Sequence, residues 1–270
     1  MRAYGTQGPT LILLHGGPGA AGYMAPVARR LADRFQVVEP LQRKGDPDAP
    51  LTVARHIADL QAVIDTVSPS EKPILIGHSW GAMLSLAWAA EHPDRAAGLV
   101  LIGCGTFEPA SRERMEAIRR RRLRRHVFKR LQARIAALDD PDERLKVQGK
   151  LMMQVDSHRL GHVDDEVVYY DALGHEQTWR DMVRLLKAGV FPPAFRAIRV
   201  PVLMLHGTDD PHPGTMIRDT LKTCLPQLVY HEWTHCGHYP WLEKDVGENF
   251  YVVLRDRLRQ MTSDRGLAGG

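Results

Sequence analysis

Short apolar runs that alternate with helical patterns constrain the fold of this chain more than any other feature. Four runs, at 10–14, 73–76, 99–102 and 200–205, are almost continuously apolar. Strands of this kind suit a parallel sheet that helices cover on both faces. Their regular return, with helical stretches between them, predicts right-handed crossover connections and an α/β fold.

The complete pattern predicts a core and an insertion. It gives strands over 10–14, 36–39, 73–76, 99–102, 200–205 and 228–233, and helices over 23–35, 51–67, 80–91, 215–224 and 246–259. The alternation stops after Gly103, and residues 106 to 195 show helical patterns only. We therefore expect an α/β core formed by residues 1–105 and 196–270, with a helical cap inserted over 106–195.

The composition agrees with one folded core that carries such an insertion. Of the 270 residues, 44% are hydrophobic and 25% are charged, which excludes a disordered or collagen-like chain. No apolar run approaches the roughly 20 residues that span a bilayer, and the N-terminus shows no secretory signal. Cys104, Cys224 and Cys236 are too widely spaced for a disulfide framework or a paired-cysteine zinc site. We expect a cytoplasmic protein without membrane association, metal or other cofactor.

The net charge of +4 comes from the expected cap, where 18 Lys and Arg stand against 14 Asp and Glu. A run over 119–130 holds seven of the arginines. Apolar residues recur at every fourth position in and after this run: Leu123, Val127, Leu131 and Ile135. This spacing predicts one amphipathic helix with a solvated basic face. We favour that interpretation over a polyanion site, so no nucleic-acid partner is expected.

The sequence Gly77-His78-Ser79-Trp80-Gly81 lies between a predicted strand and a predicted helix. This is the G-x-S-x-G pattern in the context that a nucleophile elbow requires. The serine occupies a sharp, strained turn, and side chains two positions to either side would collide with the backbone. Such a turn raises the Ser79 hydroxyl above the sheet, where a base and a substrate can reach it. We expect Ser79 to be a nucleophile.

A serine nucleophile needs a general base that an acid orients. The acid is expected after the strand at 200–205, where Asp209 and Asp210 are adjacent. Their side chains point in different directions, so only one of them can meet the base. We favour Asp210, which stands three residues after Gly207.

Three histidines lie near the end of the last predicted strand. His231 is inside the strand and is interpreted as structural, whereas His238 follows a glycine in a turn and suits a loop-borne base. His235 remains the second candidate. The order Ser79, Asp210, His238 is the one expected for this type of triad.

The oxyanion of an acyl-transfer reaction needs two backbone donors. One is the N–H of Trp80, the residue after the nucleophile. The other is expected from the loop His15-Gly16-Gly17-Pro18-Gly19, where Gly17 is favoured because proline has no N–H. A nucleotide-binding turn is the alternative for this loop, but the G-x-G-x-x-G spacing and a P-loop lysine are missing.

Nearly the whole chain resembles the α/β-hydrolase superfamily. The loop at 15–19, the elbow at 77–81 and the stretch 238–243 resemble its proline iminopeptidase-like branch. The resemblance implies a mostly parallel sheet flanked by helices, a helical cap that shapes specificity, and the triad and oxyanion residues named above. Few residues precede the first strong strand, so the usual N-terminal hairpin is expected to be truncated.

The resemblance also has departures. Residues 39–46 keep only fragments of the Asp-Gln-Arg-Gly-x-Gly-x-Ser stretch of these peptidases, and His78 stands where they tend to have glycine. The leading hypothesis is therefore a serine hydrolase that cleaves a small ester or amide through an acyl-enzyme. The alternatives are a proline iminopeptidase-like aminopeptidase that takes a short peptide, and a ligand-binding receptor with weak or no turnover. The sequence leaves the oligomeric state open.

Other candidates carry less weight. Within the expected cap, Trp179 is a candidate to line the substrate pocket, and Glu166 and Glu176 are candidates to bind a substrate amino group. A metal cluster of His231, His235, Cys236 and His238 is disfavoured, because a strand ends inside that run. Cys104 and Cys236 lack an elbow and are interpreted as buried small hydrophobic residues.

Overall fold

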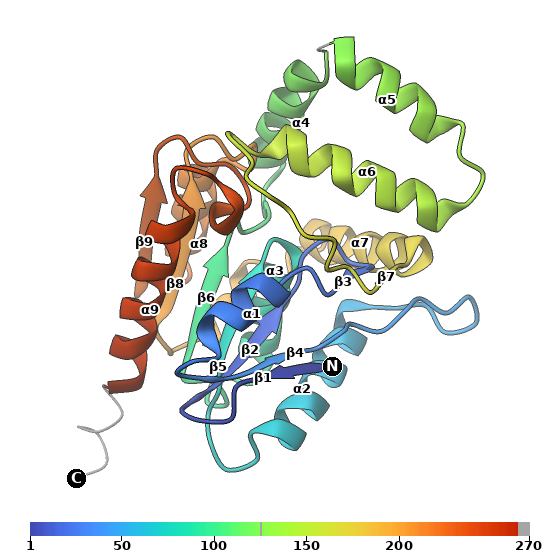
Figure 1. Ribbon diagram of the computed structural model, residues 1–270. Coiled ribbons are helices and arrows are strands. Elements are labelled where there is room, and N and C mark those ends of the chain that lie inside the picture. Colours follow the sequence, from blue (N-terminus) through green and yellow to red (C-terminus); the bar gives the residue numbers. More distant parts are fainter. Residues whose placement is uncertain (125, 264–270) are drawn as a thin grey trace.

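The computed structural model describes residues 1–124 and 126–263 and is built on a seven-stranded sheet (Figure 1). The strands, in spatial order, are β1 (Arg2–Tyr4), β4 (Gln36–Glu39), β2 (Thr10–Leu14), β5 (Ile74–His78), β6 (Gly98–Ile102), β8 (Val202–Gly207) and β9 (Leu228–Trp233). All neighbouring pairs are parallel except β1 and β4. The predicted mostly parallel sheet is confirmed.

The edge strand β1 was not predicted from the sequence. Its three residues pair antiparallel with β4, with Arg2 opposite Glu39 and Tyr4 opposite Val37. The Tyr4 hydroxyl donates a hydrogen bond to Glu39, and the Arg2 guanidinium lies 3.7 Å from the same carboxylate. These polar contacts hold a strand that is too short to show a period of two in the sequence.

Helices cover both faces of the sheet. One face carries α1 (Ala25–Leu31) and α9 (Gly247–Ser263), and the other carries α2 (Val53–Val67), α3 (Trp80–Glu91) and α8 (Gly214–Lys222). Within β2, Leu11 and Leu13 pack toward the first face, whereas Ile12 and Leu14 pack toward the second. All four side chains are buried, which stabilises the fold by about 1.5–3 kcal/mol each.

The segment between β6 and β8 lies above the carboxyl ends of the strands in Figure 1. It contains α4 (Pro109–Leu123), α5 (His126–Ala136), α6 (Pro141–Asp156), β7 (Tyr169–Tyr170), α7 (Ala172–Lys187) and the 3-10 helix η1 (Pro193–Ala197). The expectation of helices only is wrong at β7, which pairs antiparallel with β3 (Ala20–Ala21). This two-stranded sheet joins the segment to the loop after β2.

Packing divides this segment into two parts. The helices α4 to α6 share a small cluster of their own, in which Ile135, Leu151 and Val155 are buried. By contrast, Met182 of α7 and Phe195 of η1 belong to the main core cluster beneath α2 and α3. The helix α7 is therefore part of the core by its contacts, although it precedes residue 195.

The arginine-rich run does not form the single helix predicted. The helix α4 ends at Leu123 and α5 begins at His126, while residue 125 and the side chain of Val127 lie outside the described part of the chain. The expectation that the basic residues face solvent is also wrong for Arg119 and Arg122. Arg119 pairs with the buried carboxylate of Asp156. Arg122 donates to the backbone carbonyls of Val155 and Asp209, at 2.7 and 2.6 Å.

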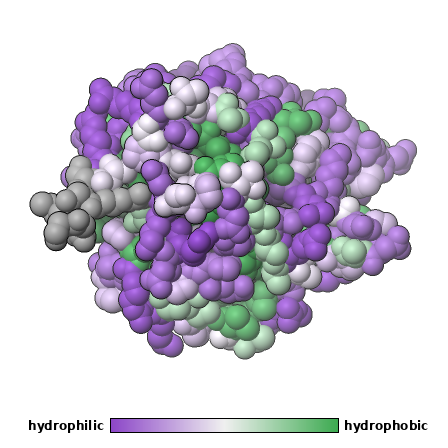
Figure 2. Space-filling model, turned by 90° about the horizontal axis from the view of Figure 1, so that it is seen from below, coloured by the Kyte–Doolittle hydropathy of each residue, from purple (hydrophilic) through white to green (hydrophobic). Residues whose placement is uncertain are grey.

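Polar side chains cover most of the face seen from below in Figure 2, and apolar groups form separate patches between them. Among residues 1–124 and 126–263, no helix combines the length and the apolar character that crossing a membrane requires.

Candidate active site

The turn between β5 and α3 holds Ser79 in a strained conformation. Its φ of 53° and ψ of −115° lie outside the regions that residues with a side chain ordinarily populate. A Cβ added to Gly77 would lie 2.2 Å from the carbonyl oxygen of Gly81, and one added to Gly81 would lie 2.1 Å from that of Leu14. Backbone crowding thus requires both glycines, and the turn leaves Ser79 at the N-terminus of α3.

Asp210 and His238 meet in the loops that follow β8 and β9. The Nδ1 atom of His238 lies 2.7 Å from the Oδ2 atom of Asp210, and both side chains are buried. The other Asp210 oxygen accepts a hydrogen bond from the backbone N–H of His212 at 2.9 Å. Burial alone would raise the pKa of Asp210, but His238, His212 and His206 together hold that pKa well below its usual range. The ionised carboxylate therefore faces one nitrogen of the His238 ring.

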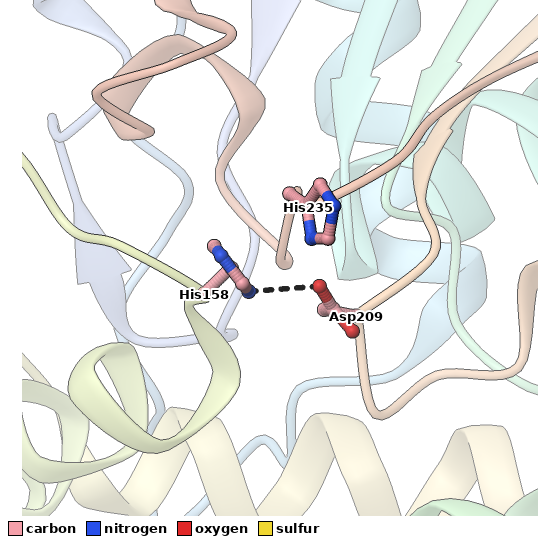
Figure 3. Close-up of side chains that lie close together, drawn as sticks. All are labelled: His158, Asp209 and His235. Carbon is pink, nitrogen blue, oxygen red and sulfur yellow. Dashed lines mark ion pairs between the residues drawn. The ribbon is translucent and has the colours of Figure 1, made fainter.

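The neighbouring candidates make other contacts. The Oδ2 atom of Asp209 lies 2.8 Å from the Nδ1 atom of His158, and His235 stands beside His158 with ring centroids 5.2 Å apart (Figure 3). His231 lies in β9, where its ring packs against Trp233. The structure brings Asp210 to His238 and leaves Asp209, His231 and His235 outside that pair.

A cavity of about 630 Å³ adjoins both Ser79 and His238. From the core, Gly17, Tyr23 and His212 also line it. Its remaining wall comes largely from the segment between β6 and β8, including Met115, Arg119, Met153, Tyr170, His175 and Trp179. A ligand in this space therefore lies between the sheet edge and the inserted helices.

Backbone donors are available on the same side of Ser79. Trp80 is the first residue of α3, so its N–H has no acceptor within the helix. Gly17 lines the cavity with a φ of 43°, whereas the preceding N–H, that of Gly16, donates to the Tyr23 hydroxyl at 2.5 Å. The Trp80 indole is buried and donates to Gln42, which leaves the backbone N–H of Trp80 as the group of this residue that can serve the site.

Sequence reasoning missed a chain of hydrogen bonds behind the site. The Tyr23 hydroxyl, which accepts from Gly16, lies 2.7 Å from Nδ1 of His78, and Nε2 of His78 lies 2.9 Å from the backbone oxygen of His238. Burial lowers the pKa of His78 well below its ordinary value, so the ring is neutral. A neutral ring accepts from Tyr23 at Nδ1 and donates from Nε2 to His238. These hydrogen bonds thus connect the loop after β2, the elbow and the loop of His238.

One residue of this hydrogen-bond network could have been identified from the sequence. His78 is an imidazole inside an otherwise apolar strand, next to Ser79. Although the Gly16 N–H is only seven residues away, nothing in the sequence marked Tyr23, because the His78 ring comes from β5. The contact exists only once the sheet has formed.

The cap candidates Trp179 and Glu176 have different outcomes. Trp179 lines the cavity, and its ring centroid is 6.0 Å from that of Trp80. Glu176 is exposed on α7, where it pairs with Arg180 one turn later, and it is not among the described residues that line this cavity. The pair of Arg119 and Asp156, which the sequence analysis placed in no site, lines the cavity instead.

Cys104 and Cys236 are both buried, and burial raises the pKa of each thiol. A protonated thiol is a poor nucleophile, which agrees with their interpretation as small hydrophobic residues.

Comparison with known proteins decides the family. A model described as "Alpha/beta hydrolase family" matches residues 11–248. The chain belongs to the alpha/beta hydrolase family. The fold of this α/β hydrolase is also that of a solved esterase from Thermogutta terrifontis, with a TM-score of 0.65, 21% identity, and coverage of 96% of this chain and 92% of that one.

Two curated relatives illustrate the range of the family. The chain is 28% identical over 273 residues to a 2-hydroxy-6-oxononadienedioate/2-hydroxy-6-oxononatrienedioate hydrolase of Paraburkholderia phymatum, covering 93% of this chain and 87% of that enzyme. It is 36% identical over 112 residues to a proline iminopeptidase of Neisseria meningitidis, covering 38% of this chain and 35% of that enzyme. Several relatives matched by short alignments are covered over only about a third of their own length.

Proposed function

We propose that this α/β hydrolase is a serine hydrolase that cleaves a small ester or amide through an acyl-enzyme, with Ser79, His238 and Asp210 as its triad. The observation that carries the proposal is the 2.7 Å contact between His238 Nδ1 and Asp210 Oδ2, beside a cavity that Ser79 also lines. The hydrolases among its relatives support the same class of reaction.

In this mechanism His238 takes the proton of the Ser79 hydroxyl as Oγ attacks the substrate carbonyl. Asp210 keeps the Nδ1 proton of His238 in place, so Nε2 is the basic nitrogen, and it stabilises the imidazolium that forms. His238 then returns the proton to the leaving group. In the second half of the reaction His238 takes a proton from water as its oxygen attacks the acyl carbonyl, and then returns that proton to Oγ of Ser79 as the carboxylic acid product leaves.

The tetrahedral intermediate carries a negative charge on the former carbonyl oxygen. The N–H groups of Trp80 and Gly17 are the proposed donors to it. Ser79 and Trp80 begin α3, whose N-terminal dipole end also favours this charge. Removing one such donor typically costs about 10²–10³ in kcat.

The volume of the cavity supports a small-molecule substrate, because ligand sites of about 300–1,000 Å³ are typical for such ligands. For an aminopeptidase, the acidic side chains that line the cavity are Asp156, Asp164 and Asp165. Asp156 pairs with Arg119, Asp164 contacts His162 and Asp165 pairs with Lys150, so each of the three already has a basic partner. These weaker features keep aminopeptidase activity as the alternative.

A second candidate substrate is a carboxylate-bearing compound of the kind named for the Paraburkholderia enzyme. Arg112 and Arg119 line the cavity from α4, although a substrate carboxylate would compete there with Glu116, 3.5 Å from Arg112, and with Asp156, the partner of Arg119. The substrate panel therefore includes 2-hydroxy-6-oxononadienedioate beside neutral esters and aminoacyl amides.

The first test is active-site labelling with a fluorophosphonate. Ser79→Ala abolishes labelling, while Ser85→Ala, a buried serine of the same helix, leaves it intact. Circular dichroism establishes that both variants are folded. Labelling that persists in Ser79→Ala contradicts the nucleophile assignment.

Turnover on the panel then separates the functions. Hydrolysis of p-nitrophenyl esters supports the esterase proposal, and hydrolysis of aminoacyl naphthylamides alone supports the peptidase. Labelling of Ser79 without turnover of any panel member favours a receptor.

A further inference from the structure

We propose that His158, Asp209 and His235 form a binding site for a divalent transition-metal ion of the zinc class, outside the catalytic cavity. The three residues come from separate parts of the chain: His158 follows α6, Asp209 follows β8 and His235 follows β9. Figure 3 shows their side chains converging on a common space. One ligand atom from each lies within 4.8 Å of the other two, and no ion occupies the site.

The donor set is suited to zinc. Two imidazole nitrogens and one carboxylate oxygen are ordinary zinc ligands, whereas calcium and magnesium prefer oxygen alone. A tetrahedral ion with bonds of about 2.0–2.1 Å separates its ligand atoms by roughly 3.3 Å. His158 Nδ1 and Asp209 Oδ2, now 2.8 Å apart, would open slightly, and His235 would move closer. Three protein ligands leave one position for water.

The backbones that carry these ligands are already fixed. The buried Glu243 carboxylate accepts hydrogen bonds through Oε1 from the N–H of His158 at 2.7 Å and from the N–H of Gly237 at 2.8 Å. The N–H of Asp209 donates to the Cys236 carbonyl at 2.8 Å. Ion binding therefore requires the side chains of the three ligands to move, whereas the backbone segments that carry them are already held in place.

The side chains have room for that adjustment. The side chains of His158 and Asp209 are 35% and 37% exposed, and His235 is also exposed. An ion can enter from solvent without opening the core. Once bound, it would connect the chain after α6 to the loops of Asp210 and His238.

The sequence analysis expected no metal, and the cluster it rejected is not the one proposed. His235 belongs to both sets, but His231 packs within β9 and His238 pairs with Asp210. The partners His158 and Asp209 are 77 and 26 positions away from His235, a spacing that no zinc motif uses.

The test is zinc binding by the full chain after treatment with a chelator. Isothermal titration with Zn²⁺ alone should give one saturable site per chain, and Ca²⁺ or Mg²⁺ should give none. His158→Ala, Asp209→Asn and His235→Asn should each weaken Zn²⁺ binding at least about tenfold, since even outer-shell changes cost 10–100-fold. Asparagine replaces His235 because its φ of 54° is one that asparagine tolerates.

The control is His162→Ala, which removes another exposed histidine that contacts a carboxylate, that of Asp164. It should keep the wild-type affinity within about twofold. Visible absorption of bound Co²⁺ gives a second readout that should disappear in the double variant of His158 and His235. Metal-free melting curves establish that the variants are folded.

Three results would overturn the proposal. The first is wild-type protein without a saturable Zn²⁺ site. The second is a stoichiometric site that persists in the double variant, which would locate the ion elsewhere, for example at Asp210, His212 and His238. The third is an equal loss of affinity in His162→Ala. None of these results bears on labelling of Ser79.

Discussion

At the scale of single residues, the neighbouring aspartates Asp209 and Asp210 contact different histidines. Asp209 is half-buried and meets His158, whereas Asp210 is buried and meets His238. The spacing argument favoured Asp210 because of its place after Gly207, and the structure locates Asp210 at the histidine. The sequence had no means of giving Asp209 its partner, because His158 lies in the inserted segment.

The first residue-scale prediction contrasts these two aspartates. Asp210→Asn should lower kcat/KM for the best ester by as much as about 10⁴-fold, because an amide favours the wrong tautomer of His238. Asp209→Asn should lower it less than about threefold. Steady-state kinetics of the two isosteric variants measure the difference, and a larger loss in Asp209→Asn would reverse our assignment of the acid.

The second residue-scale prediction concerns Tyr23. Tyr23→Phe leaves the Gly16 N–H and His78 Nδ1 without the hydroxyl between them. Since an unsatisfied buried polar group costs about 1–3 kcal/mol, kcat should fall about 10- to 100-fold through misplacement of the His238 loop. Tyr4→Phe, which also removes a hydroxyl but away from the cavity, is the control. Equal kcat values in the two variants would exclude a positioning role for Tyr23.

At the scale of elements, one buried carboxylate holds together the N-terminal edge of the fold. Glu39 ends β4, contacts Arg2 and Tyr4 of β1, and accepts a hydrogen bond from the N–H of Met24 before α1 at 3.0 Å. Burial raises the pKa of Glu39 to about 7, although Arg2 and the Met24 N–H oppose that rise. The junction of β1, β4 and α1 is therefore more stable when Glu39 is protonated.

The pH dependence follows from linkage. The folded state holds the Glu39 proton up to about pH 7, whereas the unfolded chain releases it near pH 4.5, so stability from this group is lost as the pH rises between those values. Glu39→Gln removes this loss. As the pH rises from 4.5 to 8, the free energy of unfolding of Glu39→Gln should therefore gain up to about 3 kcal/mol on that of the wild type. Urea unfolding at both pH values, with the exposed Glu91→Gln as control, measures this, and a pH-independent difference would contradict it.

Elements were predictable where burial follows a regular period. The strands β2, β5, β6 and β8 were found because every position is buried, whereas only Leu228 and Trp233 are buried in the edge strand β9. By contrast, β1 and β7 are held by long-range pairing with Glu39 and Ala20 and have no period of their own. The break between α4 and α5 was also missed, since apolar spacing continues across it.

At the scale of the whole molecule, the inserted segment and the core enclose the site together. The strained turn at Ser79 and the contact between Asp210 and His238 were predictable because chain order and loop position limit the choices within this fold. The contacts of Tyr23 with His78 and of Arg119 with Asp156 were not, because these partners lie far apart in the sequence. Glu176 was one of 14 acidic residues in the expected cap, and no pattern in the sequence separated those that line the cavity from those that are exposed.

A whole-molecule prediction follows for Trp179, which lines the cavity from α7. Trp179→Ala should change the ratio of kcat/KM between bulky and small acyl esters by about 10- to 200-fold, because large apolar contacts discriminate by about 1–3 kcal/mol. Labelling by a small fluorophosphonate should change much less. Leu173→Ala, on the exposed side of α7, is the control. Unchanged substrate ranking in Trp179→Ala would make this wall a packing element only.

The separate cluster of α4 to α6 has a consequence for motion. Among the side chains that the structure describes, Ile135, Leu151 and Val155 are the buried residues of this cluster, which are few beside the main core to which α7 belongs. Units with few buried apolar contacts open at lower free energy than the rest of a domain. Backbone amides of α4 to α6 should therefore exchange with solvent deuterium well before those of α7 and the sheet. The wall of the cavity that α4 and α6 form is therefore expected to open more readily than the wall that α7 forms.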